Sequence, residues 1–144
     1  DLVLGASATY AEAEEKDSGL VLPYAPEWSA ALTASYERAW AGKGLVWRID
    51  GALNYRDEQY QQRSERSLDD SLTLLDLRLA LAAANGDWEI ALMGRNLLDD
   101  ESSFGFDYPF WGGGDFPEGV PQGSTTLGSL NRPLTIALQG RYNF

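Results

Sequence analysis

A strict two-residue alternation near the C-terminal end constrains the fold of this chain more than any other feature. From position 134 to 144 every second residue is apolar, aromatic or glycine, and the residues between are polar or small. The first set is Leu134, Ile136, Leu138, Gly140, Tyr142 and Phe144. A period of two predicts a β-strand with one apolar and one polar face. Because a tilted strand needs about 9–11 residues to cross a bilayer, the length favours a strand of a transmembrane β-barrel.

Five further segments repeat this alternation. Together with the last one, they predict strands over residues 2–12, 28–40, 45–57, 73–83, 88–97 and 133–144. The fourth segment is rich in leucine, a good helix former, but its leucines fall at every second position and so favour a strand. The sequence thus predicts an all-β fold, an antiparallel transmembrane β-barrel segment of about six strands.

The placement of charge indicates which face meets lipid. Of twelve charged residues in the six segments, three have the apolar phase, and these lie at or near strand ends: Glu12, Arg38 and Asp57. A lipid-facing cation costs about 2–4 kcal/mol at mid-bilayer but little near the interface. We therefore expect the apolar phase to face lipid. The other nine have the polar phase: Glu37, Arg48, Asp50, Arg56, Asp76, Arg78, Glu89, Arg95 and Arg141. Among them, Arg48 and Asp50 lie on one predicted strand, and Asp76 and Arg78 lie on the next. Their opposite charges predict ion pairs between these two neighbouring strands.

The connections alternate in length. Residues 41–44 and 84–87 are short turns, the second with the hairpin signal Asn-Gly, whereas residues 13–27, 58–72 and 98–131 are long connections. Bacterial outer-membrane barrels have short periplasmic turns and long external loops. We therefore expect a location in the outer membrane of a Gram-negative type of cell, with the C-terminus periplasmic. Aromatic belts are expected at both edges, formed by Tyr36, Trp40, Trp47, Trp88, Tyr142 and Phe144 near the short turns, and by Tyr10, Trp28 and Tyr55 near the long connections.

Composition excludes several function classes. The net charge is −11, which argues against a general nucleic-acid binder. The chain has no cysteine and no histidine, so disulfides, thiolate or imidazole metal sites and a Ser-His-Asp triad are impossible. No spacing of carboxylates indicates acid–base catalysis, so we expect no enzyme, no cofactor and no metal. Residues 1–3 lack the features of a signal peptide, and we expect the chain to be part of a longer precursor.

Three stretches carry a resemblance to a known family. Residues 88–99 form a strand ending in Asn-Leu-Leu-Asp before a long loop, Arg132-Pro133 leads into a last strand that ends Arg-Tyr-Asn-Phe, and residues 22–28 read Leu-Pro-Tyr-Ala-Pro-Glu-Trp before an earlier strand. By the order and spacing of these stretches along residues 1–144, the chain resembles the C-terminal barrel portion of TonB-dependent outer-membrane receptors.

The resemblance implies that these are the last six strands of a 22-stranded barrel whose plug domain is absent from the chain. Such receptors bind a scarce nutrient, often a ferric siderophore, and import it with energy delivered through TonB. The implied partners are outer-membrane lipid, the remainder of the barrel and the plug, the nutrient, and the TonB system through the plug. The sequence does not identify the nutrient.

The long connection 98–131 is rich in aromatic residues around three consecutive glycines. Because loops on rigid scaffolds often carry binding sites, we predict contact with a ligand, and packing of the loop against itself is the alternative. The predicted contact residues are Phe104, Phe106, Tyr108, Phe110, Trp111 and Phe116.

Two alternatives to a receptor remain open at this point. One is a small porin-like or adhesin-type outer-membrane barrel, built from this chain alone or as an oligomer. The other is a soluble lipocalin-like ligand-binding barrel, because alternation by itself does not separate the two environments.

Overall fold

The computed structural model describes residues 1–13, 22–60, 68–108 and 125–144, with residues 103–108 and 125–129 described by their backbone alone. Within these ranges the chain forms strands and turns, and it contains no helix long and apolar enough to cross a membrane. The strands are β1 (Leu2–Tyr10), β2 (Trp28–Trp40), β3 (Leu45–Arg56), β4 (Gln59–Tyr60), β5 (Leu68–Asp69), β6 (Leu72–Ala83), β7 (Trp88–Arg95), β8 (Ser103–Tyr108), β9 (Thr125–Leu130) and β10 (Thr135–Tyr142).

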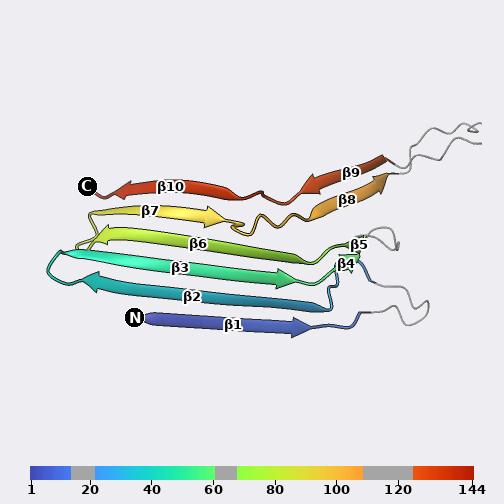
Figure 1. Cartoon of the computed structure of the whole chain (residues 1–144), viewed down its shortest axis with the longest axis horizontal. Coiled ribbons are helices and arrows are strands. Elements are labelled where there is room, and N and C mark those ends of the chain that lie inside the picture. Colours follow the sequence, from blue (N-terminus) through green and yellow to red (C-terminus); the bar gives the residue numbers. More distant parts are fainter. Residues whose placement is uncertain (14–21, 61–67, 109–124) are drawn as a thin grey trace, which may run out of the picture.

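Six of these strands form one antiparallel sheet in the order β1-β2-β3-β6-β7-β10 (Figure 1). They are the six strands that the alternation predicts, and their bounds differ from the prediction by at most two residues at each end. The predicted all-β, antiparallel, six-stranded organisation is therefore confirmed. The sheet is open, with β1 and β10 as its two edges.

The register keeps the alternating phases together across the sheet. One continuous row of paired residues runs through Leu4, Ala34, Gly51, Leu77, Gly94 and Ile136, all of the apolar phase. A slip of one residue in any strand would turn its apolar residues to the opposite face. Because no slip occurs, the sheet has one apolar face and one polar face.

The connections divide the sheet into two ends. The β2–β3 and β6–β7 turns lie at one end, which we call the short-turn end, together with both chain termini (Figure 1). Gly42, Gly44 and Gly86 have positive φ angles of 74°, 62° and 84° in these turns, a backbone region that glycine adopts without strain. The longer connections leave from the opposite end, which we call the loop end.

The structure has two small hairpins at the loop end, where the sequence predicts connections throughout residues 58–72 and 98–131. β4 pairs with β5, and β8 pairs with β9 from Ser103 opposite Leu130 to Tyr108 opposite Thr125. A signal for β8 was present, since Phe104, Phe106 and Tyr108 alternate with glycine and aspartate.

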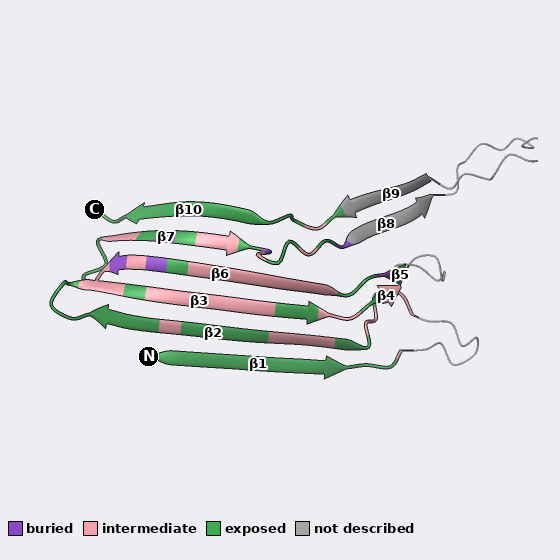
Figure 2. Ribbon diagram, viewed as in Figure 1, coloured by how far each residue is buried: buried purple, intermediate pink, exposed green. Residues whose placement is uncertain are grey.

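The sheet is a single layer without a core of its own. Among the described apolar residues, Ala80, Ala82 and Ala91 alone are buried, and no large side chain is fully buried. Figure 2 shows β1 and β10 exposed along their length, and intermediate burial over most of β3 and β6. A sheet normally buries its apolar face against another layer. This face is therefore available to a partner or a solvent of apolar character.

Candidate functional site

The polar face carries a chain of ion pairs that crosses four strands. Arg48 on β3 contacts Glu37 on β2 (Nε to Oε2, 2.5 Å) and Glu89 on β7 (Nη1 to Oε2, 3.0 Å). Arg78 on β6 contacts the other oxygen of Glu89 (2.6 Å) and Asp50 on β3 (3.4 Å). Glu89 thus binds two guanidinium groups, one with each carboxylate oxygen. We call these five residues the ion-pair network.

Small residues make room for this network. Ala80 on β6 lies opposite Arg48 in the register, and Ala82 lies opposite Glu89. Arg48 therefore reaches across β6 to Glu89, which is on the next strand. The side chain of Glu89 is only 11% exposed. The long charged side chains extend over the alanines and bury them.

The predicted cross-strand ion pairing among Arg48, Asp50, Asp76 and Arg78 is confirmed for one pair. Arg78 pairs with Asp50, as expected, and Ser35 donates a hydrogen bond to the same carboxylate (2.6 Å). Asp76 does not pair with Arg48 but accepts a hydrogen bond from the Asn96 backbone N–H (2.9 Å). The turn after β7 brings that donor to Asp76, whereas Glu37 and Glu89 occupy the guanidinium of Arg48.

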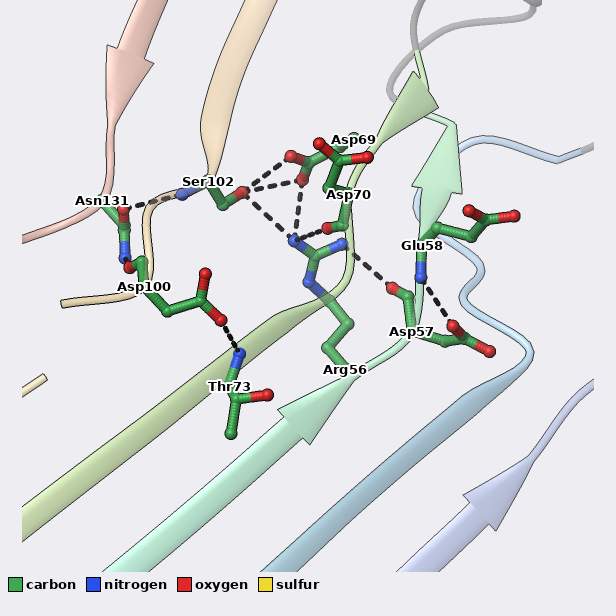
Figure 3. Close-up of polar contacts among 9 residues, drawn as sticks. All are labelled: Arg56, Asp57, Glu58, Asp69, Asp70, Thr73, Asp100, Ser102 and Asn131. Atoms are coloured by element: carbon green, nitrogen blue, oxygen red, sulfur yellow. Dashed lines mark hydrogen bonds and ion pairs between the residues drawn. The ribbon is translucent and has the colours of Figure 1, made fainter. Parts of the chain in front are cut away.

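A second polar cluster joins the strands at the loop end, and Figure 3 shows it. Arg56 at the end of β3 contacts Asp69 (2.7 Å), which is 6% exposed. Ser102 donates to the Asp69 carboxylate (2.8 Å), and Arg56 donates to the Ser102 oxygen (3.2 Å). The Thr73 backbone N–H donates to Asp100 (2.7 Å). This loop-end network ties together the β3–β6 connection and the segment that follows β7.

The Asn-Leu-Leu-Asp stretch forms a tight turn between the end of β7 and the segments that follow it. Asn96 and Asp99 have φ angles of 49° and 52°, in the left-handed region that asparagine and aspartate tolerate best after glycine. The Asn96 amide donates to the carbonyls of Asp100 (2.9 Å) and Arg132 (3.1 Å), and Asp99 accepts from the Leu134 N–H (3.0 Å). The turn thus ends β7 and fixes the start of β10.

The two ends of the segment between β7 and β10 are also joined directly. The Ser102 N–H donates to the Asn131 side chain (3.0 Å), and the Asn131 N–H donates to the Ser102 carbonyl (3.2 Å). The Asn131 amide also donates to the Asp100 carbonyl (3.0 Å). Together with the Asn96 bond to Arg132, these contacts hold the segment before β8 against the segment after β9. We call this set of contacts the neck.

Aromatic residues of the apolar face gather toward both ends of the sheet. Tyr10 and Trp28 pack at the loop end with ring centroids 4.9 Å apart. At the short-turn end, Tyr142 lies opposite Trp88 in the register and packs against Phe144 (5.0 Å). Between these groups the face consists mainly of leucine, alanine and glycine. The predicted separation of aromatic residues into two groups follows this register, although Tyr36 lies deeper in the sheet, opposite Ile49.

The predicted ligand-contact residues are divided between β8 and a part of the chain outside the described residues. Phe104, Phe106 and Tyr108 occupy β8, opposite Ser129, Leu127 and Thr125 in the register. Phe110, Trp111 and Phe116 lie outside the described residues. Ligand contact by this set therefore stays a prediction.

In the described part of the chain, no group of three acidic side chains is placed to hold a metal ion. Asp99 and Asp100 each accept a hydrogen bond from a backbone N–H group instead.

Comparisons with known proteins gave no match: no protein-family model, no curated protein and no solved structure corresponds to this chain. The two-faced sheet and its polar networks are therefore the physical basis for a functional proposal.

Proposed function

We propose that this chain forms part of the wall of an outer-membrane β-barrel, with the apolar face toward lipid and the ion-pair network toward the lumen. The observation that carries the proposal is the single-layered sheet, whose apolar residues are exposed on one face while the ion-pair network lies on the other. In a barrel of this type, outward apolar residues alternate with inward polar ones.

The dimensions of the sheet support this proposal. β2 has 13 residues from Trp28 to Trp40, which at about 3.3 Å per step gives about 40 Å along the strand. A tilt of about 40° reduces this to about 30 Å of height, which matches the hydrocarbon thickness of a bilayer. The two tryptophans then lie near the two interfaces, where amphipathic rings are favoured.

Within this class, we infer a TonB-dependent receptor that imports a scarce nutrient such as a ferric siderophore. The support is the resemblance of the Asn96–Asp99 turn, the Arg132-Pro133 pair and the final strand, in that order. The turn has a structural reason to recur in such barrels, because it ends one long strand and positions the next. The receptor would supply the remaining strands and the plug, and its long loops would contact the nutrient.

The open edges support a second candidate, a porin-like barrel assembled from several copies. β1 runs from the short-turn end to the loop end, and β10 runs in the opposite direction (Figure 1). The β10 strand of one copy can therefore pair antiparallel with the β1 strand of another, with all long loops on one side. The molecular mass of the detergent-extracted complex separates the two candidates, because a porin-like barrel contains several copies of the chain and a receptor contains one.

Membrane integration is tested by fractionating cells that produce the protein. We expect it in the outer-membrane fraction, resistant to alkaline wash and with a heat-modifiable mobility in electrophoresis. Recovery as a β-rich monomer in the aqueous phase without detergent would refute the membrane proposal and support the lipocalin-like alternative. Growth of a deletion strain on a panel of ferric chelates then tests the receptor: growth equal to that of the parent on every chelate and under iron limitation counts against it.

A further inference from the structure

A wide groove lies across the apolar face near the short-turn end. Its volume is about 870 Å³. It reaches from β2 to β10, and four strand spacings of about 4.8 Å each make it about 19 Å long. The side chains that line it are mostly large and apolar, and they include Trp47, Ile49, Leu79, Leu81, Ile90 and Leu138.

One end of the groove carries a positive charge, although the chain as a whole is strongly acidic. Arg38 lines the groove beside Trp40, and it is the cation that sits in the apolar phase. Lys43 follows Trp40 in the β2–β3 turn, where its N–H donates to the Trp40 carbonyl (3.1 Å). Arg38 and Lys43 are both exposed. Within the ranges that the structure describes, neither forms an ion pair.

Arg38 and Lys43 differ from the arginines of β3 and β6, including Arg48, which also lines the groove. Arg48, Arg56 and Arg78 each hold a carboxylate on the polar side or at the loop end. Arg38 instead lines an apolar groove, where in a membrane an uncompensated charge is costly unless an anion or water meets it. An exposed tryptophan beside it, 54% accessible, is a side chain that favours the headgroup region.

We propose that the groove binds an anionic glycerophospholipid, with an acyl chain along the groove and the phosphate at Arg38 and Lys43. The inference rests on the proposed membrane location. An acyl chain matches the length and the apolar lining of the groove, and the phosphate complements the charge of the two cations. The site lies at the short-turn end, which is the periplasmic end in the proposed orientation, so the lipid would come from the inner leaflet of the outer membrane.

The test uses native mass spectrometry of the protein in a mild detergent, with dioleoyl phosphatidylglycerol and dioleoyl phosphatidylcholine as probes. The two lipids share their acyl chains and differ in net headgroup charge. We expect preferential retention of phosphatidylglycerol, reduced about 5-fold for each cation removed in Arg38→Gln and Lys43→Gln. Arg141→Gln is the matched control, because it removes a cation near the same end but from the polar face, and it should leave retention unchanged.

A second measurement uses tryptophan fluorescence in vesicles. Trp40 and Trp47 line the groove, so brominated phosphatidylglycerol should quench emission more than brominated phosphatidylcholine does. Equal retention of both lipids, or equal effects of Arg38→Gln and Arg141→Gln, would overturn the lipid site while leaving the membrane proposal intact. A protein that never enters vesicles or detergent micelles would overturn both.

Discussion

Asn96 combines a left-handed backbone with three side-chain hydrogen bonds at the end of β7. Its amide nitrogen donates to two carbonyls, and its oxygen accepts from the Asp100 N–H (3.1 Å). The residue is 3% exposed, so water does not replace lost partners easily. One side chain therefore satisfies the backbone of a turn, of the segment after it and of the approach to β10.

Asn96→Ala is expected to lower the free energy of unfolding by about 2–4 kcal/mol, because it removes these bonds and places alanine at a positive φ. Urea titration in detergent micelles, followed by tryptophan fluorescence, measures the change. The control is Asn54→Ala, since Asn54 lies exposed on β3. An equal loss in both variants would contradict the role of the turn.

Glu89 and Glu37 are both acidic residues of the ion-pair network, but they differ in the number of arginines that they bind and in their exposure. Glu89 binds two arginines and is 11% exposed, whereas Glu37 binds one and is 53% exposed. Glu89→Gln should cost about 1–3 kcal/mol of unfolding free energy, and Glu37→Gln less than about 1 kcal/mol. Urea midpoints of the two variants at low and high salt check this order. A larger loss for Glu37→Gln would be inconsistent with the network as described.

The β6–β7 turn connects two strands and also holds the end of a third. Gly86 has a φ of 84°, and its N–H donates to the Ala83 carbonyl (2.9 Å). The Asn143 side chain donates to the Gly86 carbonyl (2.7 Å), and the Asn143 N–H donates to the Asp87 carbonyl (2.8 Å). The turn therefore also fixes the last residues of the chain beside β7.

Gly86→Ala should destabilise the protein by about 1–2 kcal/mol, because an L-residue at this φ is strained even where space is open. Gly140→Ala is the matched control: Gly140 has extended backbone in β10, and an added Cβ there meets nothing within 4 Å. The comparison uses the urea midpoint and the folding rate from denaturant into micelles. Equal midpoints for the two variants would argue against strain at the turn.

In the proposed orientation, the two faces of the sheet should differ in their tolerance for charge. Leu77 lies near the middle of the apolar face, opposite Gly51 and Gly94. Ala52 lies at the same level on the polar face, opposite Asp76. A charge at the first position would face hydrocarbon in the proposed orientation, and a charge at the second would face the lumen.

Leu77→Arg is therefore expected to reduce stability in vesicles by about 2–4 kcal/mol. Ala52→Arg should have a small effect, since the new guanidinium gains Asp76 as a neighbour. The fraction of heat-modifiable, protease-resistant protein in vesicles measures both. Equal tolerance of the two substitutions would mean that the apolar face does not contact lipid.

The strand pattern was predictable from sequence, whereas the partnerships at the strand ends were not. A period of two is local information, so the bounds of β2, β3 and β6 and the division into two faces follow from neighbouring residues. The pairing of Arg48 with Glu89 depends on the position of β7 beyond β6 and on the small Ala80 between them. Arg56, Asp69 and Ser102 likewise meet only after three segments have come together. The Asn-Gly turn was visible in the sequence because its chemistry is contained in two residues.

The neck formed by Asn96, Ser102 and Asn131 joins the segment before β8 to the segment after β9. Every hydrogen bond of the neck is made by residues outside β8 and β9. The entropy of closing a loop grows only slowly with its length. We therefore expect that segments of different length and composition can replace residues 104–129 without a change in the sheet, which makes this neck a place for the grafting of foreign sequences.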